Sequence, residues 1–399
     1  DGRKEIVKNQ NRFFPAITGI GECAMGRISE MNSMQLLAQV AKDAAKDAGI
    51  SLFEVDGIVT GPIRVEAWTN PAATIAINLG IQPTYMQTLN LAGATGVSMI
   101  QNAAMAIATG QATTVLCLVG QNLLSSMTRG GAVKGMAEGG VAHREFEATF
   151  GPIVPTLYAL VAQRHMHEFG TTEEQMADVA VAIRHYASMN ENAYMRDMLS
   201  REDVLSSRMI SSPLKKLDCS VVCDGAGAVI VTSAAKAMDH NNKPVFIMGS
   251  GYGARHSYIG EAQDITTSGA CESGEIAFKN AGLTPKDIDV AQLYDCFTIT
   301  VIIELEDLGF CPKGEGGRFV EDGNIGPGGG LPVTTYGGLL SAGHFGPGSG
   351  FMHVLEGARQ VRGDAGLRQV KNAHAALVHG NGGVMATHAT VILGDETVI

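Results

Sequence analysis

The chain has 399 residues, of which 45% are hydrophobic and 17% charged, and its formal net charge at pH 7 is −11. This composition suits a large buried core and excludes a disordered chain. The excess of acidic residues argues against nucleic-acid binding, which depends on Lys and Arg at the phosphates, and the chain has no basic run suited to a membrane surface.

The seven cysteines are odd in number, form no CxxC pair and lie mostly in apolar, strand-like segments. They predict buried free thiols rather than disulfides or a zinc site, so no metal is expected. No segment offers the roughly 20 uninterrupted apolar residues of a membrane span, and the first residues lack the apolar core of a signal peptide. We therefore expect a cytoplasmic protein without a membrane span.

The first half of the chain alternates short apolar strands with helices. Residues 34–50 carry apolar side chains at helical spacing and reach a stop signal at Gly49, and a shorter helix is expected at 71–80. The strands expected in this half are residues 15–22, 55–61, 113–122 and 224–233. This alternation predicts an α/β fold of stacked layers.

Residues 123–215 interrupt the alternation with glycine-rich turns and two amphipathic helices. We expect this segment to be a cap that is inserted into the first half and shapes a substrate cavity. The expected domains are therefore an N-terminal half at 15–243, which includes the cap, and a C-terminal half at 244–399.

The strand–helix pattern restarts at about residue 244, which indicates an internal duplication of element order. The elements expected there are a strand at 243–253, a helix at 267–281, a strand at 287–298, a helix at 299–309 and two strands within 374–394.

Two of the segments that could carry chemistry lie where strands give way to helices. In NLAGATG (90–96) the small residues let the backbone turn sharply and leave N–H groups free at a helix start, where an anion or carbonyl oxygen binds, unless the turn is only structural. In LYDCFTI (293–299) Tyr294 could transfer a proton if its pKa is lowered, or else cap the core. Asp295 is expected to orient or cap the helix that follows.

Two further segments are rich in glycine. His344 lies among small residues in PVTTYGGLLSAGHFGPGSG (332–350), where an imidazole seldom serves packing and suits acid/base work or donation to a carbonyl oxygen. Tyr336 in the same loop is expected to line the cavity. In VHGNGGV (378–384) consecutive glycines expose N–H groups for an oxyanion hole, and His379 and Asn381 add polar reach, although such hairpins also form for geometric reasons alone.

Other well-known signatures are missing from the sequence. GIGECAMG (19–26) resembles the start of a dinucleotide-binding loop, but it contains no GxGxxG and no suitable acidic residue follows at a later strand end. The chain also lacks GxSxG, HExxH and Walker motifs. A nicotinamide cofactor is therefore not expected.

From about residue 15 to its end, the chain resembles thiolase-superfamily proteins of the sterol carrier protein X type. The most specific stretches are 208–231, 293–323 and 336–350. The resemblance implies a five-layer αβαβα fold of two similar halves, with the loop or cap region inserted. It also implies a dimeric core and acyl-CoA thioesters as substrates, with no covalently bound cofactor.

The departures from the thiolase pattern decide the expected chemistry. Thiolases carry a nucleophilic Cys in a Cys-Ala-Ser/Thr-Gly turn, but GATG places Gly93 there, and the second Cys is missing from HGNGGV. His344 matches the family's Gly-His-Pro motif, with Phe345 in place of Pro, and Tyr294 stands where the family has Asn or His. Both thiols of a two-cysteine Claisen mechanism are therefore absent.

Without a thiol, an acyl-enzyme cannot form in the ordinary way, whereas retro-aldol cleavage needs a base for a β-hydroxyl and donors for an enolate. The resemblance implies Tyr294 as the base and His344, with the N–H groups around Gly93 and Gly383, as the enolate site. The supporting residues would be Asp295, Tyr336, His379 and Asn381.

The pattern is similar to that of the steroid side-chain-cleaving aldolases, which share YDxF and lack the Cys but carry Tyr where this chain has His344. Those aldolases work with a separate acyl-CoA-binding subunit that combines a zinc ribbon and an OB-fold, so the resemblance implies a hetero-oligomer here too. The leading prediction is retro-aldol cleavage of a β-hydroxyacyl-CoA with a steroid or other bulky ring. The alternatives are CoA-dependent cleavage of a β-ketoacyl-CoA, by direct attack of CoA or through Cys296, and a non-catalytic acyl-CoA or lipid-binding scaffold.

Overall fold

The computed structural model describes residues 14–126 and 142–399. The part of the predicted cap at 127–141 lies outside the described residues. All seven cysteines are free, as predicted; four of them are buried, whereas Cys219, Cys271 and Cys311 are only half-buried.

The strands form one mixed nine-stranded sheet in the order β3-β2-β4-β7-β1-β8-β11-β10-β9 and a separate two-stranded ribbon of β5 and β6. Their bounds are β1 (Ala16–Glu22), β2 (Gly57–Thr60), β3 (Tyr85–Thr88), β4 (Thr114–Gln121), β5 (Met209–Ser211), β6 (Leu214–Lys215), β7 (Gly225–Thr232), β8 (Val245–Ala254), β9 (Val290–Gln292), β10 (Ala375–Gly382) and β11 (Thr387–Gly394).

The large sheet consists of two halves that are joined by a short contact. In the first half β2 pairs in parallel with β3 and β4, and β7 pairs antiparallel with β4 and β1. In the second half β11 pairs antiparallel with β8 and β10, and β10 is parallel to β9. Only Ala16 and Ile17 of β1 pair with β8, so the two halves meet at the end of one strand.

The helices divide between the two halves and the cap. Their bounds are α2 (Ser33–Ala48), α3 (Pro71–Leu79), α4 (Thr95–Ala108), α5 (Leu123–Ser126), α7 (Val154–Phe169), α8 (Glu173–Ser188), α9 (Arg201–Leu205), α10 (Ala234–Ala237), α11 (Ala270–Ala281), α12 (Thr298–Asp307), α13 (Gly316–Phe319) and α14 (Phe351–Arg362).

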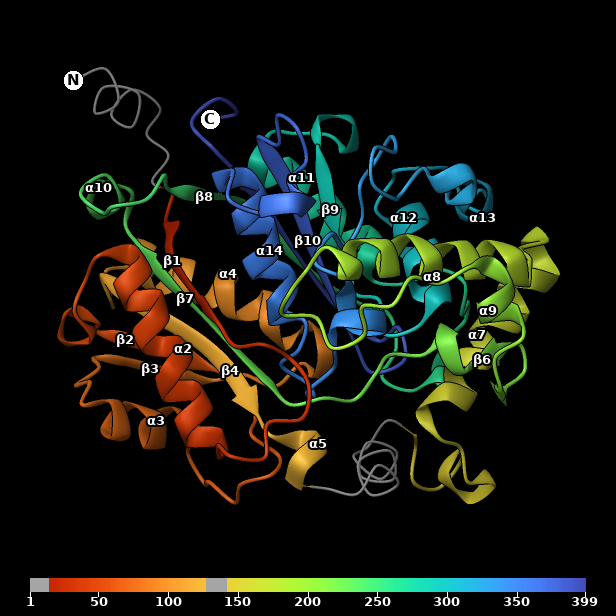
Figure 1. Cartoon of the computed structure of the whole chain (residues 1–399), viewed down its shortest axis with the longest axis horizontal. Helices are drawn as coiled ribbons and strands as arrows, with labels where there is room; N and C mark the ends of the chain where they lie inside the picture. Colours follow the sequence, from red (N-terminus) through yellow and green to blue (C-terminus); the bar gives the residue numbers. More distant parts are fainter. Residues whose placement is uncertain (1–13, 127–141) are drawn as a thin grey trace.

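Helices and strands stack in the predicted five layers (Figure 1). α2 and α3 cover the outer face of the first half of the sheet, and α11 covers the outer face of the second half. α4 and α14 pack on each other and contact strands of both halves, so they form the central layer. Gly96 makes this possible, because a Cβ there would lie 2.2 Å from the backbone nitrogen of Phe351 at the start of α14.

Local signals explain where several helices begin and end. Asn32 and Gln35 form a capping box at the start of α2, and Gly49 ends this helix with a left-handed φ of 76°. Thr172 and Gln175 form the same box at α8. Gly49 is the stop that the sequence pattern predicted for this helix.

One predicted strand is much shorter than expected. The sequence predicts a strand over 287–298, but β9 ends at Gln292. The next residue, Leu293, turns out of the sheet because its N–H donates to Thr334 Oγ1 at 3.1 Å and its carbonyl accepts from the same hydroxyl at 2.9 Å. This departure from the sheet brings Tyr294 to the central layer.

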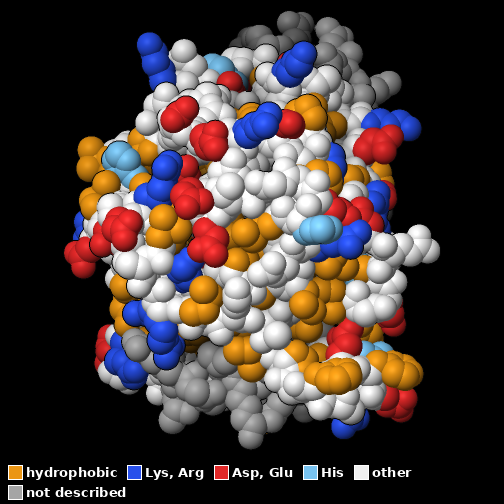
Figure 2. Space-filling model, turned by 90° about the vertical axis from the view of Figure 1, so that its right-hand side faces the viewer, with side chains coloured by type: hydrophobic (Ala, Val, Ile, Leu, Met, Phe, Trp, Pro, Cys, Tyr) orange, Lys and Arg blue, Asp and Glu red, His pale blue; other side chains and the backbone are white. Residues whose placement is uncertain are grey.

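The cap helices α7, α8 and α9 lie together at one end of the molecule (Figure 1). Figure 2 looks onto that end, where the described acidic and basic side chains are mixed and do not form the continuous basic surface that nucleic acid requires. Within 14–126 and 142–399, no helix is long and apolar enough to cross a membrane.

Candidate active site

Gly93 and Tyr294 lie against each other although they are distant in the sequence. Gly93 belongs to the short 3-10 turn η2 (Ala92–Ala94) that leads into α4. A Cβ at position 93 would lie 2.3 Å from Cζ and 2.4 Å from Oη of Tyr294, and 2.1 Å from the carbonyl oxygen of Asn381. The Tyr294 phenol therefore occupies the space into which a side chain at position 93 would extend.

The turn that carries Gly93 is strained at the preceding residue. Ala92 has a left-handed φ of 49°, a conformation that costs a non-glycine residue on the order of 1 kcal/mol. Such strain is common at functional sites, where the surrounding structure holds the backbone in one geometry.

His344 contacts the Tyr294 hydroxyl from a third segment of the chain. Tyr294 Oη and His344 Nε2 lie 3.2 Å apart, and only 4% of Tyr294 and 9% of His344 is exposed. Burial raises the pKa of Tyr294 well above its ordinary value and lowers the pKa of His344 to about 4. Both groups are therefore neutral at pH 7, a phenol beside an uncharged imidazole.

The His344 backbone is fixed by hydrogen bonds to residues just before β7. Its N–H donates to the Val221 carbonyl at 2.7 Å, and its carbonyl accepts from the Cys223 N–H at 3.1 Å. Gly343, with φ of 142°, passes so close to Cys223 that a Cβ there would meet the Cys223 sulfur. The glycine-rich loop is therefore fixed, and it holds the imidazole in one orientation.

His353 on α14 is a site residue that the sequence analysis missed. Its ring stacks on Tyr294 with centroids 5.9 Å apart, and its Nδ1 hydrogen-bonds with the Tyr336 hydroxyl at 3.2 Å. The only sequence feature that could have pointed to His353 is its position in a helix, nine residues after His344. Tyr336 thus supports the ring behind Tyr294.

Asp295 has a different partner from the one expected. Its carboxylate accepts the N–H groups of Leu339 at 2.8 Å and Leu340 at 3.0 Å, in the π-turn η8 (Gly338–Ala342). The prediction that Asp295 caps α12 was wrong, since α12 has no side-chain cap. The carboxylate instead fixes the turn that precedes His344, and it lies 3.3 Å from Nε2 of His353.

The β10–β11 hairpin forms the other wall of the site. The Gly383 carbonyl accepts the Tyr158 hydroxyl at 2.8 Å, which ties the hairpin to the cap helix α7. Asn381 presents its backbone carbonyl to Gly93, while its side-chain Nδ2 lies 2.9 Å from Met385 Sδ. Of the residues predicted from VHGNGGV, Asn381 therefore borders Gly93 through its backbone carbonyl, and Gly383 lies at the turn of the same hairpin.

His379 takes part in a separate buried chain of hydrogen bonds. Its Nε2 hydrogen-bonds with His388 Nδ1 at 3.0 Å, and its Nδ1 with Thr390 Oγ1 at 2.8 Å. Burial and the neighbouring His388 lower the pKa of His379 well below its ordinary value. Neither ring nitrogen of His379 therefore faces Tyr294 or His344.

Cys296 does not offer an alternative nucleophile. It is 7% exposed, and burial raises its pKa, so it remains a thiol at neutral pH. Because the thiolate is the reactive form, the environment disfavours attack by this sulfur.

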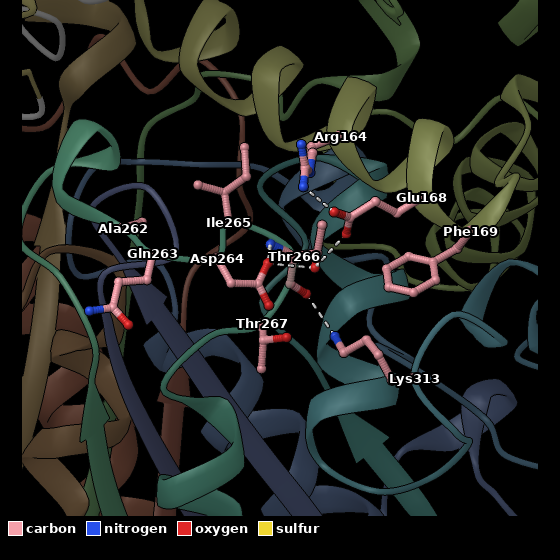
Figure 3. Close-up of a pocket in the computed structure, with 10 residues that line it drawn as sticks. All are labelled: Arg164, Glu168, Phe169, Ala262, Gln263, Asp264, Ile265, Thr266, Thr267 and Lys313. Carbon is pink, nitrogen blue, oxygen red and sulfur yellow. Dashed lines mark hydrogen bonds and ion pairs between the residues drawn. The ribbon is translucent and has the colours of Figure 1, made fainter.

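A pocket of about 450 Å³ lies away from this site (Figure 3). It is at the C-terminal end of α12, whereas Tyr294 precedes the N-terminus of that helix. Its cations already have partners, since Lys313 pairs with Asp307 at 2.6 Å and Arg164 with Glu168. Among the described residues, no group of His, Cys, Asp and Glu side chains could hold a metal ion.

The fold and the site together define a thiolase-type protein, and the chain belongs to the thiolase superfamily. The family model of the thiolase N-terminal domain matches residues 15–235, and that of the thiolase C-terminal domain-like family matches residues 251–395. This confirms the family and the fold class that the sequence motifs indicated.

The relatives include enzymes of two activities. The chain is 34% identical over 394 residues to the steroid side-chain-cleaving aldolase of Thermomonospora curvata, with 96% of this chain and 98% of the relative covered. It is 33% identical over 380 residues to an acetyl-CoA acetyltransferase of Methanothermobacter thermautotrophicus, with 94% and 98% covered. The solved structure of the Ltp2-ChsH2(DUF35) aldolase superposes with a TM-score of 0.83 at 31% identity and covers 96% of this chain and 98% of its own.

Proposed function

We propose that the protein is a carbon–carbon lyase that cleaves β-hydroxyacyl-CoA thioesters by a retro-aldol reaction. One observation carries this proposal: position 93 has no side chain, and the Tyr294 phenol fills the adjoining space. Acyl transfer through the enzyme requires a nucleophile, whereas retro-aldol cleavage requires only proton transfer and a site for the enolate.

In the proposed reaction, the β-hydroxyl gives its proton to Tyr294 Oη while Tyr294 passes its own proton to His344 Nε2, 3.2 Å away. The Cα–Cβ bond breaks, its electron pair forms the thioester enolate, and the β-carbon leaves as a ketone or aldehyde. The imidazolium then returns the proton through Tyr294 to Cα, which yields the shortened acyl-CoA. The N–H groups of Gly93 and Gly383 themselves would hold the enolate oxygen, because the neighbouring Ala92 and Ala94 N–H groups already donate to Asn90 Oδ1 and to the Leu91 carbonyl.

Because Tyr294 and His344 are both neutral, a proton relay between them fits the site better than a mechanism that requires a free phenolate. Because burial raises the pKa of Tyr294, the phenol can act as a base only if its own proton leaves at the same time. The relay needs His344 with Nε2 as acceptor. The Gly346 N–H contact with Nδ1 favours the other tautomer, but at 3.3 Å it is longer than ordinary N–H hydrogen bonds and is weak.

The relatives support a particular kind of substrate and assembly. Because the chain is similar to an enzyme named a steroid side-chain-cleaving aldolase, we propose a β-carbon in a steroid or other bulky ring. We also propose a homodimeric core with a separate zinc-ribbon/OB-fold subunit that binds acyl-CoA. The two-component name of the similar solved aldolase supports this assembly.

A second candidate is CoA-dependent cleavage of a β-ketoacyl-CoA, which the acetyltransferase relative favours. In this chain CoA would have to attack the ketone directly, because Gly93 has no thiol and Cys296 is buried as a thiol.

The two candidates differ in whether they require free CoA. We would incubate the protein with β-hydroxyacyl-CoA thioesters, one of them with a ring-substituted β-carbon, and with the matching β-ketoacyl-CoA thioesters. Each would be tested with and without free CoA and a zinc-ribbon/OB-fold subunit. Cleavage of the hydroxy compound without CoA supports the lyase, and cleavage that requires CoA contradicts it. Binding without any product would indicate a scaffold.

A further inference from the structure

The turn between β10 and β11, residues 383–386, has an unusual backbone. Gly383 has a left-handed φ of 70°, and Met385, which carries a side chain, has a left-handed φ of 54°. The Ala386 N–H closes the turn on the Gly382 carbonyl at 3.0 Å. Because strained backbone persists only where the surroundings hold it, the direction of the Gly383 N–H depends on the contacts of this turn.

Two side chains from other parts of the fold bind the carbonyl groups of the turn. The Tyr158 hydroxyl on the cap helix α7 donates to the Gly383 carbonyl at 2.8 Å. His256, which follows β8, donates from Nε2 to the Val384 carbonyl at 2.8 Å. Two consecutive peptide groups are therefore fixed from two different elements, which opposes rotation of the Gly383 backbone.

The Tyr158 ring is itself fixed by the segment that carries the proposed base. It stacks on Phe297 with centroids 4.4 Å apart, and both side chains are buried. Thr300 Oγ1 lies within hydrogen-bond distance of the Tyr294 carbonyl, at 2.9 Å, and of the Phe297 carbonyl, at 2.6 Å. Burial raises the pKa of Tyr158 well above its ordinary value, so its hydroxyl keeps the proton and remains a donor. Tyr158 therefore joins the segment of Tyr294 to the hairpin turn.

We propose that Tyr158 and His256 are positioning residues that direct the Gly383 N–H toward the enolate oxygen. Tyr158 also fixes this donor relative to Tyr294, because its ring packs on the segment that carries the base. Both residues act through the backbone of the turn. Their effect on turnover rests on the proposed lyase function, but their constraint on the turn does not.

Amide hydrogen exchange tests the constraint on the turn without any substrate. Tyr158→Phe keeps the stacked ring and removes only the hydroxyl. Tyr186→Phe is the matched control, because the Tyr186 hydroxyl is buried and has no hydrogen-bond partner among the described residues. We expect the peptide that contains residues 383–387 to exchange at least about threefold faster in Tyr158→Phe and at the wild-type rate in Tyr186→Phe. Equal exchange in the two variants would overturn the proposal, whether or not the protein has lyase activity.

Turnover then tests the effect on the enolate site. Removal of an oxyanion-hole donor costs about 10²–10³-fold in kcat, so a donor that has lost its orientation should cost about tenfold. We expect Tyr158→Phe to lower kcat for the β-hydroxyacyl-CoA by this factor, with KM within about twofold. It should slow equally the exchange of the Cα hydrogens of acetyl-CoA with heavy water, which forms an enolate without cleavage. Tyr186→Phe should keep both rates, and wild-type rates in Tyr158→Phe would overturn the positioning role.

A pair of variants at position 256 separates hydrogen bonding from packing. His256→Gln keeps an N–H donor for the Val384 carbonyl, whereas His256→Leu removes it. We expect kcat to fall in His256→Leu and to be largely retained in His256→Gln, and equal turnover in the two folded variants would exclude His256 from the role. If the wild type neither cleaves a substrate nor exchanges acetyl-CoA, the proposed function fails, while amide exchange still decides whether Tyr158 holds the turn.

Discussion

The contact between Gly93 and Tyr294 makes substitution at position 93 the most informative test of the site. Replacement of Gly93 by Ala adds one methyl group, and its φ is not in the left-handed region, so the change introduces no backbone strain of its own. The added Cβ would lie 2.1 Å from the Asn381 carbonyl oxygen and 2.3–2.4 Å from Tyr294 Cζ and Oη. Ordinary contacts begin at 3.4 Å, so the phenol must move by about 1 Å.

This displacement should affect activity more than stability. Overpacking of a close-packed interior typically costs 1–3 kcal/mol, and the rigid Asn381 carbonyl places Gly93→Ala at about 3 kcal/mol. A 1 Å misplacement of a reacting group costs on the order of 100-fold in rate. We therefore expect Gly93→Ala to fold with a lower melting temperature and to cleave β-hydroxyacyl-CoA about 100-fold more slowly.

The assay compares this variant with a matched glycine. Gly326→Ala adds the same methyl group where the nearest atoms lie 3.3 and 3.7 Å away, and it should keep nearly normal turnover. Adding Tyr294→Leu to Gly93→Ala removes the ring contacts, so the double variant should lose less stability than the sum of the single changes. Wild-type turnover and melting temperature in Gly93→Ala would refute the view that the phenol fills this space.

Three further outcomes follow from the buried groups of the site. Tyr294→Phe removes the hydroxyl but keeps the ring, so turnover should fall by about 10²–10⁴-fold while the melting temperature stays within a few degrees; unchanged turnover would exclude Tyr294 from the proton relay. Cys296→Ala should retain cleavage, because burial keeps this group a thiol, and complete loss of activity with retained folding would reopen its role as nucleophile. Burial lowers the pKa of His344 and of His388 to about 4, against the ordinary value of 6.5. As the pH falls from 6.5, these histidines are therefore protonated in the unfolded chain but not in the folded one. The free energy of unfolding should decrease by about 3 kcal/mol per histidine as the pH falls from 6.5 to 4. The melting temperature should therefore fall less steeply with decreasing pH in His388→Gln than in the wild type. Equal slopes in the two proteins would contradict the lowered pKa of His388.

Much of the fold could be predicted because its signals are local. The capping box at Asn32 and the left-handed Gly49 delimit α2, and the apolar run 113–122 gives the central strand β4. The strand before Tyr294 was predicted too long because β9 ends through a contact with Thr334, which lies far along the chain. No local pattern carries that information.

The same distinction between local sequence signals and contacts of distant segments holds for the candidate site. The absence of a thiol at Gly93 and the presence of Tyr294 and His344 are sequence facts, and they already direct the expected chemistry away from an acyl-enzyme. The partner of Asp295 and the support from His353 depend on which distant segments the fold brings together.

The sequence by itself therefore determined the family, the layered α/β fold and the absence of a side chain at position 93, because residue identity and short-range spacing are sufficient for each. Only the tertiary structure decided that the Tyr294 phenol occupies the space beside Gly93 and that its hydroxyl has a neutral imidazole next to it. Both depend on volume and desolvation, which exist only after η2, β9 and the His344 loop have packed against one another.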